Sequence, residues 1–233
     1  MADTEYYYAK VQGKIVFLLD DDDKSFPDPL SVPMKDRLPD GLFAVGGDLS
    51  PERLVEAYSQ GIFPWAAFRL NELHWYCPME RFVIFPEEIH VSHSMRTLLN
   101  KGKYTVTMDT CFRDVINHCS QLRIEEEGAW LGPQMVEAYA KLHDRGVTHS
   151  VEVWDMYGRL AGGLYGVYLN GGFFGESMFS LVPSASKIAL IHLAEYLKEH
   201  GGKLIDCQFE TPHLKSMGGR HISYEEYMDI LWT

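Results

Sequence analysis

Two polar side chains near the C-terminal end of the sequence have a spacing that suits acid–base chemistry. Asp206 and Gln208 lie two residues apart within the segment 203–209, whose apolar composition predicts a buried strand. Residues two apart on a strand point to the same face, so this pattern predicts a carboxylate beside a carboxamide. Such a buried pair is either a structural hydrogen-bond pair in the core or an acid–base or orienting dyad. The pattern by itself favours the structural interpretation and leaves the catalytic one open.

A second carboxylate, Glu176, lies in the aromatic segment 173–179, where it either anchors a substrate amine or bridges to a neighbouring strand. The residues around it begin like the nucleophile elbow of a serine hydrolase, but Phe179 takes the place of the closing glycine. The nearby glycines fail the dinucleotide-binding fingerprint. They also fail the pyrophosphate loop of acetyl-CoA enzymes, because Leu164 stands where a small residue is needed. Neither a hydrolase nor a CoA-dependent enzyme is therefore favoured.

Aromatic residues gather in two further segments, 61–65 and 75–78. The pattern predicts that the first cluster lies on a loop and that the second follows a short hairpin. Such aromatic clusters form a small satellite core when buried, or a stacking platform for bases when exposed. Both interpretations remain open at this point.

The composition is that of a folded globular protein, with 46% hydrophobic and 23% charged residues in a chain of 233. A net charge of −12 repels polyanions, so broad coating of nucleic acid is disfavoured, although a local basic patch can still dock one nucleic-acid end. Neither His90-x-x-His93 nor His118-Cys119 has a second ligand pair at zinc-site spacing, so we expect no metal. The apolar segment 14–19 runs into four aspartates, and we expect a soluble, intracellular protein.

Hydrophobic periodicity predicts the elements that must position these residues. Helices are expected over residues 51–60, 92–99, 112–119 and 134–143, and from a cap at Ser184 to Gly201. Strands are expected over 11–19, 81–85, 150–154, 160–169, 173–179 and 203–209. A meander followed by a helix and another strand predicts an α+β fold with a mixed sheet packed by helices. We place a boundary near residue 80, between a small N-terminal domain (1–80, with a peripheral acidic segment 1–25) and a larger domain (81–233).

Seven motifs also stand in the order and spacing of one family. They are GGDLSP (46–51), YxxGIFPW (58–65), HSVEVW (149–154), GGLYG (162–166), FGESMFS (174–180), ASK (185–187) and LIDCQ (204–208). Over residues 26–230 the chain resembles the bacterial leucyl/phenylalanyl-tRNA–protein transferases. The resemblance implies a small N-terminal domain packed on a C-terminal domain with an acyl-CoA N-acyltransferase-like (GNAT-like) fold. It also implies a cytoplasmic enzyme that uses neither a metal nor a diffusible cofactor.

The activity implied by the resemblance is aminoacyl transfer. Leu or Phe, and less well Met, would pass from aminoacyl-tRNA to the α-amine of proteins that begin with Arg or Lys, marking them for degradation by the N-degron (N-end rule) pathway. Aminolysis of an ester requires an oriented amine, removal of its proton and stabilisation of an oxyanion. Asp206 and Gln208 match the family's catalytic pair. In that role Asp206 would polarise Gln208, whose carbonyl would accept a proton or hydrogen bond from the amine.

The resemblance implies binding roles as well. Trp65 and Trp130 would hold the terminal adenosine by stacking, and Glu176 would be a polar anchor in the side-chain pocket. The remaining implied site residues are Tyr139 and the lining of an apolar side-chain pocket, namely Leu164, Phe173 and Leu190. Candidates for a local basic strip against the acceptor stem are Arg96, Lys101, Lys103 and Lys187, although the sequence favours scattered solvated side chains for them.

Two departures from the family pattern concern recognition rather than chemistry. Ala129 stands where Thr is usual, and Leu181 stands where Arg is usual. Two other functions remain open: a different aminoacyl-tRNA-dependent peptide ligase, and a non-catalytic binder of aminoacyl-tRNA or basic N-terminal peptides. The intact pair of Asp206 and Gln208 argues against the binder, which needs no catalytic pair.

Overall fold

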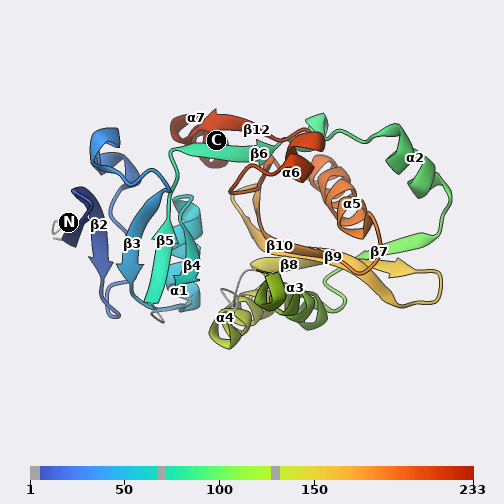
Figure 1. Ribbon diagram of the computed structural model, residues 1–233, viewed down its shortest axis with the longest axis horizontal. Helices are drawn as coiled ribbons and strands as arrows, with labels where there is room; N and C mark the ends of the chain where they lie inside the picture. Colours follow the sequence, from blue (N-terminus) through green and yellow to red (C-terminus); the bar gives the residue numbers. More distant parts are fainter. Residues whose placement is uncertain (1–5, 68–71, 127–131) are drawn as a thin grey trace.

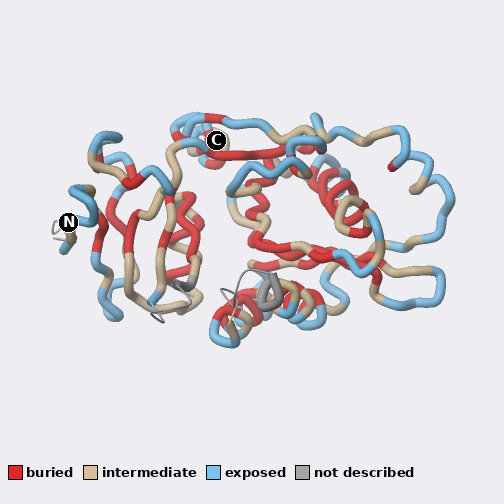
Figure 2. The backbone as a smooth tube through the Cα atoms, viewed as in Figure 1, coloured by how far each residue is buried: buried red, intermediate tan, exposed pale blue. Residues whose placement is uncertain are grey.

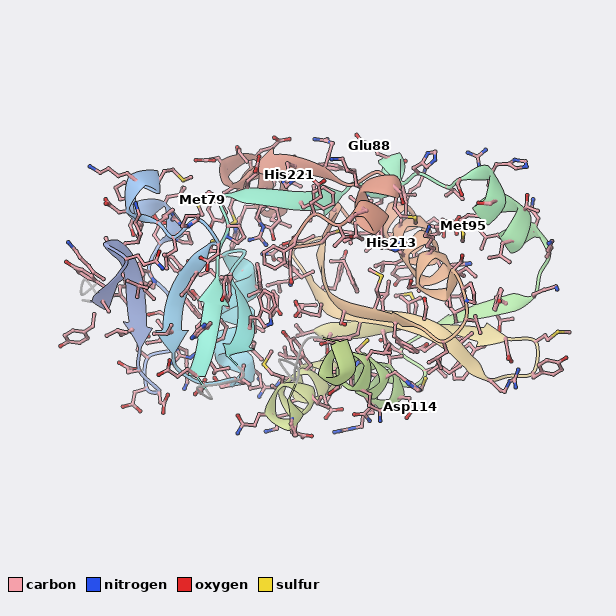
Figure 3. The ribbon with its side chains drawn as sticks, viewed as in Figure 1. Met79, Glu88, Met95, Asp114, His213 and His221 are labelled. Atoms are coloured by element: carbon pink, nitrogen blue, oxygen red, sulfur yellow. The ribbon has the colours of Figure 1, made fainter. Side chains whose placement is uncertain are left out.

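The computed structural model describes residues 6–67, 72–126 and 132–233. Its two β-sheets lie toward opposite ends of the long axis, and helices pack on both faces of the larger sheet (Figure 1). Met79 lies at the junction between the two sheets, and His221 lies on the outermost strand of the larger one (Figure 3). The α+β fold with a mixed sheet packed by helices is therefore confirmed.

The smaller sheet has five strands. In spatial order they are β1 (Tyr7–Val11), β2 (Lys14–Leu19), β3 (Leu42–Gly46), β5 (Glu72–Tyr76) and β4 (Phe63–Ala67). Only the second half of the expected strand 11–19 is correct, because Gln12 and Gly13 take left-handed conformations and turn β1 onto β2. The aromatic cluster at 61–65 was expected on a loop, but it lies mostly on β4, which pairs with β5 in a hairpin. Its side chains are therefore held by a sheet.

The larger sheet has seven strands. In spatial order they are β12 (Arg220–Ser223), β6 (Glu80–Ile84), β11 (Leu204–Asp206), β10 (Gly172–Ser180), β9 (Leu160–Leu169), β8 (Thr148–Asp155) and β7 (Tyr104–Met108). The expected meander is β8, β9 and β10, which pair antiparallel. β10 and β11 are parallel, so the chain must cross over the sheet between them. Helix α5 (Ala185–Glu199) makes that crossover.

All of the predicted helices are present, namely α1 (Pro51–Ser59), α2 (His93–Asn100), α3 (Phe112–Glu126), α4 (Pro133–Asp144) and α5, although α3 continues well beyond its expected end at residue 119. The sequence did not predict α6 (Pro212–Ser216), α7 (Tyr224–Trp232) or the 3₁₀ turns at Pro29–Ser31, Met34–Asp36 and Pro86–Glu88. α1 begins as expected, because the Ser50 hydroxyl accepts a bond from the Arg53 amide. α5 does not begin as expected: Ser184 is left-handed, and the Ser180 hydroxyl instead accepts a bond from the Ser186 amide.

Two apolar cores fill the molecule, one on each face of the larger sheet. The core on the α5 side is formed by α5 with Phe173, Ile205 and Leu164. The core on the α3 and α4 side continues through helix α1, where it includes Leu54, to the smaller sheet, where it includes Trp75. Figure 2 shows buried backbone in both sheets and in the helices between them. Because one core spans both sheets, the two halves stabilise each other, and the domain boundary near residue 80 stays a prediction.

The strand that carries Asp206 is shorter than the sequence indicates. β11 ends at Asp206, and Gln208 has a left-handed backbone with φ of 62°. The expectation that alternation along a strand places Asp206 and Gln208 on one face is therefore wrong. The two residues still meet, but a tight turn brings them together.

Gly166 provides a test of the packing inside the larger sheet. A Cβ at this position would lie 2.2 Å from the Phe174 carbonyl oxygen and 2.5 Å from the Phe173 ring. Gly166→Ala should therefore lower the free energy of unfolding by about 3 kcal/mol, because β9 or β10 must shift. Urea denaturation measures this change. Gly132→Ala is the control, since its Cβ would meet nothing within 4 Å, and equal stabilities of the two variants would contradict the packing described here.

Candidate active site

A cavity of about 260 Å³ opens where the two sheets meet. Its walls come from β4, β9, β10, α5, the end of β11 and α6. Seven of the nine predicted site residues line it: Trp65, Leu164, Phe173, Glu176, Leu190, Asp206 and Gln208. Tyr139 lies behind this wall and reaches the site by bonding to Glu176. Trp130 lies outside the described residues, so its stacking role stays a prediction.

One end of the cavity is apolar. Leu164, Phe173 and Leu190 are at most 3% exposed and come from β9, β10 and α5. Burial of an apolar ligand side chain against these groups is favourable, by about 25 cal/mol for each Å² removed from water. The structure thus brings together the three residues expected to line a side-chain pocket.

Trp65 also lines the cavity and comes from strand β4. Its ring centroid is 5.6 Å from that of Tyr76 and 5.7 Å from that of Phe209, and Phe209 is 39% exposed. Trp65 also lines a second hollow, which Gln208 and Phe209 share. An aromatic group that borders both the cavity and the open surface can stack on a flat ligand ring.

Asp206 is fully buried and accepts bonds on both carboxylate oxygens. Oδ2 accepts from the Arg81 guanidinium and from the Tyr227 hydroxyl at 2.8 Å, while Oδ1 accepts from the backbone amide of Gln208 at 2.8 Å. Arg81 is also fully buried. Burial alone would lower the pKa of Arg81, but the carboxylate of Asp206 raises it above its usual value. Asp206 therefore reaches Gln208 through the backbone, and not through the carboxamide that it was expected to polarise.

Glu176 is the carboxylate that contacts the Gln208 carboxamide. Its Oε1 accepts from Gln208 Nε2 at 2.9 Å and from the Tyr58 hydroxyl at 2.7 Å, while Oε2 accepts from the Tyr139 hydroxyl at 2.8 Å. Since Nε2 is engaged, the carbonyl oxygen of Gln208 is left to accept a bond from a ligand. None of the hydrogen bonds formed among the described residues uses that oxygen as an acceptor.

A β-bulge explains the position of Glu176. Gly175 pairs with Gly166 and Ser177 with Tyr165, which leaves Glu176 as an extra residue on β10. Bulges of this kind re-aim a side chain and are frequent beside active sites. Glu176 consequently lies beside the hydroxyls of Tyr58, from α1, and Tyr139, from α4.

Burial raises the pKa of Glu176 to about 7. Hydrogen bonds from Tyr58, Tyr139 and Gln208 act in the opposite direction, and the negative charge of Asp206 adds to the increase. Burial also raises the pKa of both tyrosines well above its usual value, so they remain neutral donors. Glu176 is thus a carboxylate that can gain or lose a proton near neutral pH.

The sequence interpretation missed three contributors to this site: Tyr58, Arg81 and Tyr227. Arg81 had a signal, because a charged residue that begins an otherwise apolar strand needs a buried partner. Tyr58 stood inside a recognised motif, but only as a residue of the apolar face of a helix. Tyr227 had no local signal, since its contact with Asp206 joins residues that are brought together by folding.

Neither a metal cluster nor a membrane helix occurs in the part of the chain that the structure describes. In residues 6–67, 72–126 and 132–233, no three His, Cys, Asp or Glu side chains are grouped so as to hold a metal ion. Within the same ranges, no helix has the length and apolar character needed to cross a membrane.

The fold and the site together define an α+β protein in which a meander, a crossover helix and a parallel strand surround an apolar cavity. Residues 83–232 match the family model for leucyl/phenylalanyl-tRNA protein transferase, and residues 47–79 match the model for the N-terminal domain of the same proteins. The chain therefore belongs to the leucyl/phenylalanyl-tRNA–protein transferase family. This confirms the resemblance drawn from the seven motifs.

Relatives named leucyl/phenylalanyl-tRNA–protein transferase match most of the chain. The protein of Chromohalobacter salexigens is 53% identical over 84% of this chain and 75% of its own length. The protein of Nitrosomonas eutropha is 50% identical over 83% of this chain and 82% of its own length. The protein of Stutzerimonas stutzeri is 47% identical over 90% of this chain and 91% of its own length. Among solved structures, L-PGS from Bacillus licheniformis is similar with 14% identity and a TM-score of 0.44, over 86% of this chain and 63% of that one.

The pKa of Glu176 predicts a dependence of stability on pH. The pKa is about 7 in the folded protein and 4.5 in the unfolded chain, so the folded state holds the proton more tightly. The difference in free energy of unfolding between wild type and Glu176→Gln should therefore be constant below pH 4.5. As the pH rises from 4.5 through 7, wild type should lose stability relative to the variant, by about 3 kcal/mol in total. Urea denaturation of both proteins from pH 4 to 8.5 measures the difference, and a constant difference would contradict the assignment.

Proposed function

We propose that this aminoacyltransferase moves Leu or Phe, and less readily Met, from charged tRNA to the N-terminal α-amine of proteins that begin with Arg or Lys. The product would be a degradation signal of the N-degron pathway, formed in the cytoplasm, where charged tRNA is found. The observation that carries the proposal is the cavity itself, whose lining combines the apolar side chains of Leu164, Phe173 and Leu190 with Gln208. Such a cavity suits an apolar aminoacyl group whose ester lies beside a hydrogen-bond acceptor.

The aminoacyl end of the charged tRNA would occupy the cavity in one orientation. Its apolar side chain would occupy the pocket at Leu164, Phe173 and Leu190, and its terminal adenosine would stack on Trp65. The ester carbon then lies between these ends, near Gln208. Trp130 would complete the adenosine site, as the family resemblance implies.

The reaction forms an amide bond and breaks an ester bond. The neutral α-amine of the acceptor attacks the ester carbon, loses one proton, and the 3′-oxygen of the terminal ribose leaves with a proton. Gln208 would accept a hydrogen bond from the attacking amine through its carbonyl oxygen, and Asp206 would fix the turn on which Gln208 stands. Orientation of the amine is the larger contribution, because a carboxamide is a poor base.

A transfer assay tests this function and its two catalytic residues. Labelled Leu or Phe should pass from charged tRNA to peptides that begin with Arg or Lys, and not to a peptide that begins with Ala. Gln208→Ala and Asp206→Ala should each reduce the rate by about 10²-fold or more, because the amine is no longer oriented. Gln121→Ala, at an exposed position on α3, is the matched control.

Two outcomes of the same assay would contradict the proposal. Transfer to cell-wall peptides but to no Arg or Lys peptide would indicate a different aminoacyl-tRNA-dependent ligase. Binding of charged tRNA without transfer to any acceptor would indicate a binding protein.

Donor preference tests the apolar pocket. Leu190 is 2% exposed and lines the cavity, so Leu190→Ala enlarges the space for the aminoacyl side chain. The variant should lose about 10-fold in kcat/KM for Leu-tRNA and less for Phe-tRNA, because the smaller side chain fills the enlarged pocket less well. Competition between the two charged tRNAs measures the ratio. An unchanged ratio would place the aminoacyl side chain elsewhere.

A further inference from the structure

We propose that Glu176 is the base of this reaction, that it takes the amine proton through the carboxamide of Gln208, and that Asp206 is a positioning residue only. This inference rests on the proposed function, since it concerns the same cavity and the same amine. It assigns the two buried carboxylates of the site to different tasks.

The contacts of Asp206 exclude it as a proton acceptor. Its Oδ2 is bound by the guanidinium of Arg81 and the hydroxyl of Tyr227, and its Oδ1 is bound by the backbone amide of Gln208. A proton on this carboxylate would cancel its charge and leave Arg81 as an uncompensated buried cation. The contacts of Asp206 therefore fix the Gln208 turn and balance the charge of Arg81.

The surroundings of Glu176 are different. Its three partners, Tyr58, Tyr139 and the Gln208 carboxamide, are all neutral donors, and none of the ion pairs formed by the described residues includes it. Glu176 is also 7% exposed, so solvent stabilises its charge little. Protonation of this carboxylate consequently leaves no buried charge behind.

The hydrogen bond between Glu176 and Gln208 has the direction that a proton relay needs. Gln208 Nε2 donates to Glu176 Oε1 over 2.9 Å, and this bond turns the Gln208 carbonyl oxygen away from the carboxylate. Gln208 lines the cavity in which the amine must attack. An ionised Glu176 thus orients the Gln208 carbonyl oxygen as an acceptor for the amine, whereas a protonated Glu176 already carries the proton that the relay would deliver.

The step balances in atoms and charge. The lone pair of the amine nitrogen forms the bond to the ester carbon while an N–H proton passes to Gln208 Oε1 and an Nε2 proton passes to Glu176 Oε1. Glu176 becomes a neutral acid and Gln208 an imidic acid. The reverse transfers then return one proton to the departing 3′-oxygen of the ribose. The tetrahedral intermediate expels that oxygen as a hydroxyl group, and both side chains regain their initial states.

The acidity of Glu176 is consistent with this role. Its pKa of about 7 lies close to that of an α-amine, about 7.7–8.0, so proton exchange between the two groups is nearly balanced in energy. The charged and titratable groups that face Glu176 are Tyr58, Tyr139 and Asp206. The two tyrosine hydroxyls lower its pKa, and the negative charge of Asp206 raises it.

The pH dependence of kcat/KM distinguishes this role from a structural one. Wild type should lose activity below about pH 7. Tyr139→Phe removes one donor from the carboxylate, so the acid limb of its profile should move to higher pH by about half to one unit. Titration of the acceptor amine is common to all variants and cannot produce this shift. Tyr157→Phe, at an exposed position in the β8–β9 turn, is the matched control and should superimpose on wild type.

Substitution of the carboxylates completes the test. Glu176→Gln should lower the rate at pH 8 by about 10²-fold or more with charged-tRNA affinity unchanged within a few-fold, and should abolish the enzyme's own acid limb. Asp206→Asn should lower the rate but keep that limb. The proposal is overturned if the pH profile of Tyr139→Phe superimposes on that of wild type. It is also overturned if the acid limb is lost in Asp206→Asn and kept in Glu176→Gln. A wild-type protein with no transfer at any pH would instead refute the proposed function.

Discussion

The buried negative charge of Asp206 is the constraint around which the site is organised. A buried carboxylate requires a cation and further hydrogen-bond donors. Arg81, which is itself fully buried, supplies the cation. Arg81 also donates to the Gly61 carbonyl at 2.6 Å, and its guanidinium lies 4.5 Å from the centre of the Tyr227 ring. One ion pair therefore joins four places in the chain: the start of β4, β6, the end of β11 and α7. A loss of this pair would disturb all four.

Two carboxylates in one cavity acquire different chemistry from their partners alone. Asp206 has a cationic partner and remains bound to it, while Glu176 has neutral partners and a pKa raised by burial to about 7. In many enzymes, two titratable groups take different acid–base roles because their environments move their pKa values apart. The difference arises from which element each carboxylate faces, since Asp206 faces β6 and α7 and Glu176 faces α1 and α4.

Hydrophobic periodicity in the sequence predicted α1, α5 and the meander. Each of these elements buries one face, and that burial imposes a regular spacing of apolar residues. Periodicity failed at Gln208, where alternation along a strand was assumed although the backbone turns to a φ of 62°. Seven of the predicted site residues line one cavity, and their roles stay predictions. The partners of those residues were not predictable, because Arg81 meets Asp206 across 125 positions and Tyr58 meets Glu176 across 118.

The bulge on β10 explains why both halves of the chain are needed to complete the site. In a regular strand, one added residue reverses the face of every later side chain, and the bulge confines that change to Glu176. Glu176 is thereby directed toward Tyr58 on α1, which belongs to the N-terminal part, while Gln208 approaches from the C-terminal part. The carboxylate binds both partners only when the shared core around Tyr58 and Tyr139 is packed. Packing between the sheets and assembly of the proton acceptor are therefore the same event.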